Sequence, residues 1–143
     1  MMTNQSKNYS QKLELRVDWS DIDSFGHVNN LRMMRYAQSG RVEYLSRIGL
    51  MQMHETEQKG PILAAISSQF LKPLFFPDRV TVFSKVEGIK NTSFKLLHEI
   101  YNSRTELVAK VEDVIVFYDF RKGEKQYLPD KIRKKIQQIE EAK

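Results

Sequence analysis

Hydrophobic and polar residues alternate along much of this chain, and the alternation predicts a series of strands. The clearest case is residues 12–19, where apolar side chains occupy every second position from Leu13 to Trp19. A period of two places successive side chains on opposite faces of a sheet, so this segment predicts a half-buried strand. Comparable runs bounded by turn residues predict four more strands, over 61–72, 79–87, 93–101 and 106–120.

The last of these runs, residues 106–120, changes phase along its length. Its early apolar positions, ending at Val111, do not fall on the same face as those that begin at Val114. An extra residue in one strand shifts a period-two pattern in this way, so we expect a β-bulge near Glu112 and Asp113.

A different period runs from Asn30 to about Ile48. Polar residues recur there three and four positions apart, without a proline, which is the spacing of one face of an α-helix. The rest of the circumference is largely apolar, so we expect a sheet to enclose this helix. Gly40 in its middle costs about 1 kcal/mol relative to alanine, which indicates close packing at that point.

A second helix is predicted at the end of the chain. It opens after Leu128 and Pro129 and places Ile132, Ile136 and Ile139 on one apolar edge of an otherwise basic sequence. Between the first helix and the strands lies the polar stretch HETEQKG, after which we expect only strands up to the last helix.

Composition limits the number of domains and the class of protein. With 143 residues, 41% of them hydrophobic, the chain can bury one core, so we expect a single domain over 11–143 after a disordered lead at 1–10. The absence of cysteine excludes a disulfide scaffold and thiolate sites, and favours the cytoplasm as the compartment. No segment approaches the ~20 apolar residues that a membrane span requires.

Charge is distributed unevenly. The net charge is +5, and residues 121–143 hold eight Lys or Arg against four Asp or Glu. This distribution indicates a basic tail on a nearly neutral body, and it favours a phosphate-bearing small ligand over nucleic acid, whose binding needs basic residues spread along a face.

The stretch DSFGHVNN, residues 23–30, carries the candidate chemistry. The first N–H groups of a helix have no intrahelical acceptor, so those near Asn29 and Asn30 could bind an oxyanion that forms at a carbonyl. Asp23 is the acid placed to act as base or nucleophile opposite that oxygen. Gly26 removes a side chain there and lets the backbone bend sharply into the helix.

The order of elements and three motifs resemble the hotdog-fold acyl-CoA thioesterases of the 4-hydroxybenzoyl-CoA thioesterase-like family. The motifs are Asp21-x-Asp23-x-x-Gly26-His27-Val28-Asn29-Asn30, FLKPLFFPDRVTV at 70–82, and a last strand followed by a turn and Leu128-Pro129. The resemblance implies an α+β fold with an antiparallel sheet of about five strands around one long central helix, and a short C-terminal helix. It also implies hydrolysis of acyl-CoA to free acid and CoA without a cofactor, in a homodimer or homotetramer.

Site residues follow from the same resemblance. Asp23 matches the spacing of the family's acid to the glycine, and His27 is expected to assist it by orienting Asp23, bonding to the thioester or shaping the turn. The substrate is expected to contact Gly26, Val28, Asn29 and Asn30.

The remaining expectations concern phosphate binding by two cations and metal binding by histidines. Lys72 and Arg79 flank the turn LKPLFFPDR and are expected to meet the phosphates of CoA. With only His54 and His98 besides His27, no metal site is expected.

Four other functions stay open. A non-hydrolytic acyl-thioester sensor needs no catalytic acid, although the chain has one at Asp23. The plant acyl-carrier-protein thioesterases place an asparagine where this chain has Phe25. A hotdog dehydratase would need a loop with His-Phe-Pro-Gly, which the chain lacks. A nucleic-acid binder would need aromatic residues among the basic residues of the tail.

Overall fold

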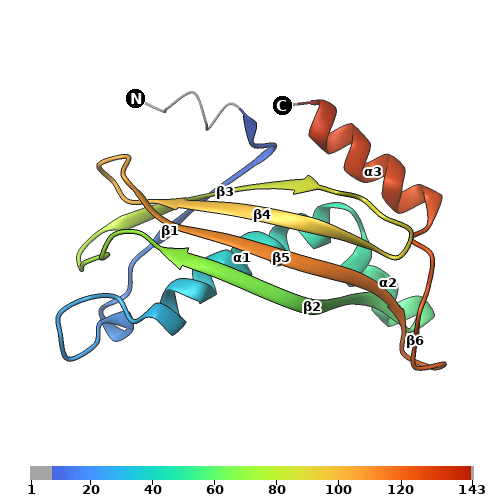
Figure 1. Ribbon diagram of the computed structural model, residues 1–143, viewed down its shortest axis with the longest axis horizontal. Coiled ribbons are helices and arrows are strands. Elements are labelled where there is room, and N and C mark those ends of the chain that lie inside the picture. Colours follow the sequence, from blue (N-terminus) through green and yellow to red (C-terminus); the bar gives the residue numbers. More distant parts are fainter. Residues whose placement is uncertain (1–7, 143) are drawn as a thin grey trace.

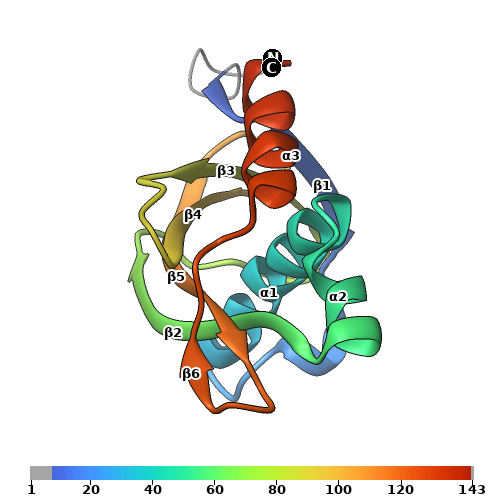
Figure 2. The ribbon, with the colours of Figure 1, turned by 90° about the vertical axis from the view of Figure 1, so that its right-hand side faces the viewer.

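One sheet curls around one long helix in the computed structural model, which describes residues 8–142 (Figures 1 and 2). The strands are β1 (Gln11–Arg16), β2 (Lys59–Phe70), β3 (Arg79–Glu87), β4 (Ser93–Tyr101), β5 (Leu107–Asp119) and β6 (Glu124–Lys125). The helices are α1 (Asn30–Arg47), α2 (Leu50–Glu57) and α3 (Asp130–Glu141), with a short 3-10 turn, η2 (Trp19–Asp21), before α1. No helix within the described range is long and apolar enough to cross a bilayer.

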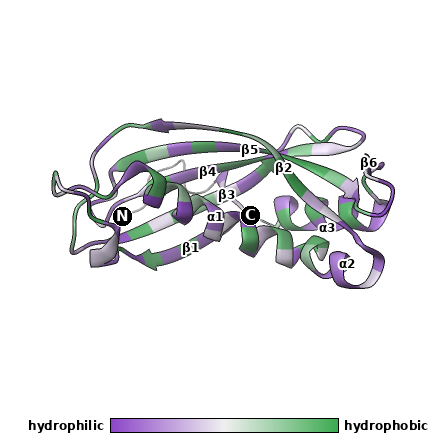
Figure 3. Ribbon diagram, turned by 90° about the horizontal axis from the view of Figure 1, so that it is seen from below, coloured by the Kyte–Doolittle hydropathy of each residue, from purple (hydrophilic) through white to green (hydrophobic). Residues whose placement is uncertain are grey.

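The sheet is antiparallel throughout, in the order β1-β3-β4-β5-β2, and β6 pairs with the end of β5. The five predicted strands and the long helix are confirmed. Hydrophobic and hydrophilic residues alternate along the strands (Figure 3). Buried apolar residues of the strands cluster with those of α1. In the strand order given above, β2 forms one edge of the sheet and β1 the other.

The longest strand has a register irregularity, but the predicted position at Glu112 and Asp113 is wrong. Strand β5 keeps one phase from Ala109 to Phe117, and its extra residue is Val108, opposite Ile100 and Tyr101 of β4; β2 has another at Ala64. The cause is Asp113, which occupies a helix-facing position and is fully buried. A charged residue at a core position hides the alternation that apolar residues reveal.

Helix α2 was not predicted from the sequence. Its residues Leu50 and Met53 are buried, and Gly49 before it adopts φ +85°. The rest of this short helix is largely polar, which is why its sequence gave little sign of a helix.

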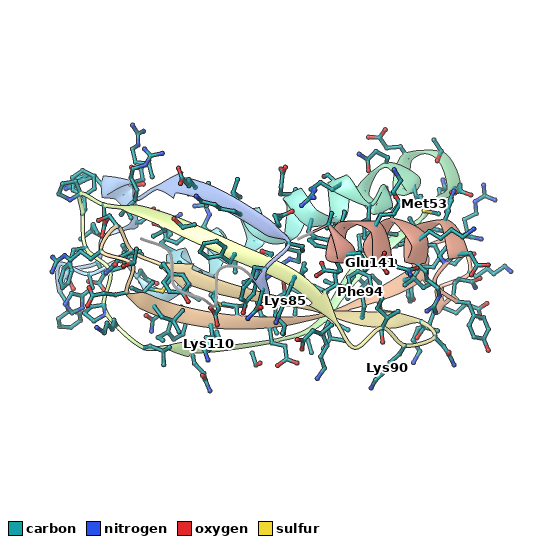
Figure 4. All side chains as sticks on the ribbon, turned by 90° about the horizontal axis from the view of Figure 1, so that it is seen from above. Met53, Lys85, Lys90, Phe94, Lys110 and Glu141 are labelled. Carbon is teal, nitrogen blue, oxygen red and sulfur yellow. The ribbon has the colours of Figure 1, made fainter. Side chains whose placement is uncertain are left out.

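The core divides into two clusters along α1. One surrounds the C-terminal half of α1 and includes Tyr44, Met53, Phe94 and residues of α2 and α3 (Figure 4). The other surrounds the N-terminal half and is formed with β1, β3 and β5. Each half of the helix is thus held against the sheet by its own set of buried side chains.

The start of the described chain packs against strand β3 and helix α3. The ring of Tyr9 lies 6.0 Å from that of Phe83, and the Ser10 hydroxyl donates to Glu140 of α3 at 2.6 Å. The rest of the predicted lead, residues 1–7, falls outside the described residues.

Gly40 lies between the two clusters, where α1 approaches the sheet closely. A Cβ at this position would lie 3.0 Å from Ser84 Oγ and from a methyl group of Val82, and 3.3 Å from His98 Nδ1. The close packing expected from the sequence at Gly40 is therefore confirmed.

We predict that Gly40→Ala destabilises the protein, although alanine is the better helix former. Overpacking costs about 1–3 kcal/mol, and the gain in helix propensity is only about 1 kcal/mol. The free energy of unfolding, measured by urea titration, should fall by about 1 kcal/mol, the difference between the two effects. The exposed variant Glu43→Ala on the same helix serves as control, with a change within about 0.5 kcal/mol. An unchanged or raised stability of Gly40→Ala would contradict the close contact.

Candidate active site

The loop between η2 and α1 is closed by hydrogen bonds at Asp23. The Asp23 N–H donates to the carbonyl of His27 at 2.8 Å, and Asp23 Oδ1 accepts from the N–H groups of Phe25 and His27 at 2.9 and 3.2 Å. Gly26 at the tip adopts φ +81°. A Cβ there would meet nothing within 4 Å, so the glycine is required for its backbone angle rather than for space.

One carboxylate oxygen of Asp23, Oδ2, is available for a reaction. The loop uses Oδ1, whereas Oδ2 has no hydrogen-bond partner among residues 8–142. The side chain is held in place by two backbone N–H groups and still presents a carboxylate oxygen to its surroundings. Such an oxygen can accept a proton from water or attack a carbonyl carbon.

The N–H groups at the start of α1 are used unequally. Those of Val28 and Asn29 donate to the carbonyls of Leu74 and Asp21 at 2.7 and 2.9 Å. That of Leu31 donates to the side chain of Asn29, which caps the helix, at 2.8 Å. The N–H groups of Asn30 and Arg32 have no acceptor within the described part of the chain, so these two donors are left at the helix end for an oxyanion.

These groups line one open cavity of about 440 Å³ between the start of α1 and the end of β2. The lining residues are Asp23, His27, Val28, Asn29, Asn30, Met33, Phe70, Leu71, Lys72 and Pro73. The structure therefore brings together most of the residues that the sequence selected. Gly26 and Arg79 are outside this lining.

The two predicted cations differ in their surroundings. Lys72 Nζ lies 2.7 Å from Glu106 Oε2, and this hydrogen bond lowers the pKa of the Glu106 carboxyl below its ordinary value. Lys72 thus reaches the cavity with its charge already balanced. Arg79 is at the beginning of β3, next to Asp78, whose carboxylate accepts the Arg79 N–H at 2.7 Å. His27 lies beside the cavity with its ring 5.2 Å from that of Phe75, edge to face.

A buried polar group that was not singled out from the sequence lies beneath Gly40. Ser84 Oγ is 2.6 Å from His98 Nδ1, and His98 Nε2 is 2.8 Å from Asp113 Oδ2. Arg41 Nη1 lies 3.6 Å from the other oxygen of Asp113. Polar residues at helix-facing positions of three predicted strands were the signal that could have revealed it.

The order serine, histidine, aspartate is also that of a hydrolase triad, but this group cannot act as one. Ser84 is fully buried, and the backbone of α1 at Gly40 covers it, so no carbonyl can reach its oxygen. Its role is to join α1 to the sheet. Elsewhere in the described range, no three His, Cys, Asp or Glu side chains come together as a metal site would require.

Solved structures support the same fold. A thioesterase from Thermus thermophilus, solved with coenzyme A and Zn, is 26% identical with a TM-score of 0.84, over 94% of this chain and 97% of that one. A 1,4-dihydroxy-2-naphthoyl-CoA thioesterase from Synechocystis is 20% identical with a TM-score of 0.79, over 87% of this chain and 93% of that one. The hotdog fold expected from the sequence is confirmed.

Sequence comparison gives the family. An acyl-acyl carrier protein thioesterase of Arabidopsis thaliana, the chloroplastic ATL3, is 30% identical over 87% of this chain, which spans 66% of that protein's length. The uncharacterized protein YsmA of Bacillus subtilis is 23% identical over 58% of this chain and 55% of its own. The family model of the thioesterase-like superfamily matches residues 17–136. The chain therefore belongs to the thioesterase-like superfamily.

Proposed function

We propose that the protein hydrolyses acyl-CoA thioesters in the cavity at the start of α1. The observation that carries the proposal is that two residues line the same cavity: Asp23, which has an available carboxylate oxygen, and Asn30, whose N–H has no acceptor among residues 8–142. A thioester carbonyl between them would meet a nucleophile or base on one side and a hydrogen-bond donor at a positive helix end on the other.

The chemistry follows from these two groups. Asp23 either takes a proton from water as it attacks the carbonyl carbon or attacks the carbon itself to form an anhydride that water then opens. In both routes the carbonyl oxygen becomes negative, and the Asn30 N–H and the dipole of α1 stabilise it. The carbon–sulfur bond then breaks, and the CoA thiolate leaves and takes up a proton. His27 is placed at the same cavity to orient Asp23 or to bond to the thioester.

The carrier of the acyl group distinguishes two candidates. Coenzyme A is favoured because a relative covering almost the whole chain was solved with it. An acyl carrier protein is the second candidate, because the relative ATL3 acts on that class of substrate by its name. The binding-only alternative has the same cavity but no use for Asp23.

A second copy of the chain is the proposed partner. Between Gly60 and Phe70 the edge strand β2 has no charged residue, and its unpaired backbone can accept another strand. Its helix-facing side chains Leu63, Ile66 and Phe70 remain about 40% exposed. Antiparallel pairing of two β2 edges would cover them and form a homodimer, from which a homotetramer could be built.

Asp23→Asn is predicted to lower turnover by two or more orders of magnitude. The amide oxygen can still accept the N–H groups of Phe25 and His27, so folding should change little, while the base or nucleophile is lost. Thiol release from a panel of acyl-CoA substrates measures the effect.

The matched control is Asp78→Asn, an exposed loop carboxylate that also accepts backbone N–H groups, from Arg79 and Ser103. It should leave turnover at the parent level. Equal activity of Asp23→Asn and the parent would remove Asp23 from the mechanism. A parent that binds acyl-CoA but releases no thiol at any chain length would establish the sensor alternative.

Asn30→Pro tests the backbone donor. Asn30 is the first residue of α1, where proline is well tolerated and lacks only the N–H, and Asn29 before it has ψ 139°, which suits a following proline. The comparison variant Asn30→Ala loses the side chain and keeps the N–H. We expect kcat of the proline variant to lie about 10²–10³-fold below that of the alanine variant. Equal kcat values would show that the oxyanion is bound elsewhere.

Ile66→Lys tests pairing at the β2 edge. A lysine on the helix-facing side of this edge should oppose burial of a second copy, and light scattering should report a smaller species. Ile89→Lys is the control, because Ile89 is 41% exposed and Ile66 40% exposed, but Ile89 lies in the β3–β4 turn. A parent that is monomeric at all concentrations would exclude the assembly.

A further inference from the structure

A second cavity lies on the opposite side of the α1 start, toward β1. It measures about 360 Å³ and contains three arginines, Arg16 from the end of β1 and Arg32 and Arg35 from the first two turns of α1. None of these residues lines the cavity that holds Asp23. Two elements far apart in the sequence thus direct three guanidinium groups to one hollow.

None of these three arginines forms an ion pair or a side-chain hydrogen bond within residues 8–142. Two cations nearby differ in this respect: Lys72 at the Asp23 cavity pairs with Glu106, and Lys12 of β1 pairs with Glu14. The charges of the three arginines are therefore not balanced by an ion pair.

Two acids also line the cavity, and both are engaged by their own loop. The buried Asp21 accepts the Tyr36 hydroxyl at 2.9 Å and the Asp18 N–H at 3.2 Å through the same oxygen. The exposed Asp18 accepts the Ser20 N–H at 3.1 Å, a contact that lowers the pKa of its carboxyl. Three guanidinium groups outnumber two carboxylates, so an anion still gains from entering.

The chemistry of the trio points to phosphate. A guanidinium group matches two oxygens of a phosphate with parallel N–H donors, and three of them can neutralise a doubly or more highly charged group. A solvated polar face of α1 would explain Arg32 and Arg35 alone, but it does not explain why Arg16 of another element joins them around a hollow.

The distance to the reacting centre suits a phosphopantetheine carrier. Arg32 and Arg35 follow Asn30 by two and five residues, about 3 and 8 Å along the helix axis at 1.5 Å per residue. An extended pantetheine arm spans roughly 15 Å, at about the advance per bond of an extended peptide. The arm is therefore longer than the separation of Asn30 from either arginine along the helix axis.

We infer that Arg16, Arg32 and Arg35 bind the phosphate of the thiol carrier, on the face of α1 opposite to Asp23. The inference rests on the proposed hydrolysis of acyl thioesters for its choice of ligand. The bound phosphate can belong to coenzyme A or to the phosphopantetheine of a carrier protein, because both carry a phosphate next to the pantetheine arm.

Calorimetric titration of coenzyme A and of pantetheine, which lacks phosphate, tests the site without catalysis. Arg32→Gln and Arg35→Gln should each weaken coenzyme A binding by about tenfold and leave pantetheine binding at the parent level. Arg104→Gln, an exposed arginine in the β4–β5 turn, is the matched control and should bind coenzyme A as the parent does. Because no hydrolysis is measured, an inert protein that shows this pattern supports the inference and contradicts only the proposed function.

Kinetics separate recognition from a structural role. With acyl-CoA, the two variants should raise KM by about tenfold without lowering kcat. With S-acyl pantetheine, variants and parent should share one KM. A loss that extends to S-acyl pantetheine would mean that the arginines act through the shape of the helix end, and it would overturn the inference.

Two further results decide where the phosphate binds and which thiol carrier it belongs to. Unchanged coenzyme A affinity in both variants, or a loss found instead in Lys72→Gln or Arg79→Gln, would also overturn the inference. With S-acyl 4′-phosphopantetheine, a persistent tenfold effect supports recognition of the phosphate that coenzyme A shares with carrier proteins. An effect confined to coenzyme A supports recognition of its nucleotide phosphates.

Discussion

The position of α1 against the sheet is the constraint on which the candidate site depends. A helix enclosed by a sheet can slide along its axis if its contacts are only apolar, because apolar contacts have no direction. Here Gly40 brings the helix backbone down onto Ser84 and His98, and Arg41 faces the buried Asp113. The close steric fit at Gly40 and the ion pair between Arg41 and Asp113 at 3.6 Å together favour one position of the helix between its two apolar clusters.

Fixing the middle of α1 also fixes its beginning. The N-terminal half packs on a cluster that includes Met33 and Leu74, and Leu74 in turn accepts the Val28 N–H. The loop and the turn after β2 are thereby tied to each other across the cavity. Preorganised donors of this kind stabilise a forming charge without having to move, which is the largest contribution in many enzymes that act on carbonyl groups.

The sequence predicts the scaffold well because the scaffold follows short-range periods. The strands and α1 were found from alternation and helical spacing, and the loop residues from their position before the helix. The pairing of Lys72 with Glu106, 34 positions away, and the convergence of Arg16 with Arg35 depend on tertiary structure. The phase error in β5 has the same origin, because the partners that allow Asp113 to be buried lie on other elements.

The start of α1 also separates two groups of the proposed substrate, the phosphate and the thioester carbonyl. Its positive end attracts any anion, phosphates included, yet the candidate active-site cavity holds the carboxylate of Asp23 and a lysine already neutralised by Glu106. A phosphate in that cavity would face like charge, whereas on the β1 side three arginines outnumber the two carboxylates, Asp18 and Asp21. The uncharged thioester carbonyl has no such penalty beside Asp23. The end of α1 can therefore orient the proposed substrate. Each of its two faces repels, or does not hold, the group of the substrate that the other face binds.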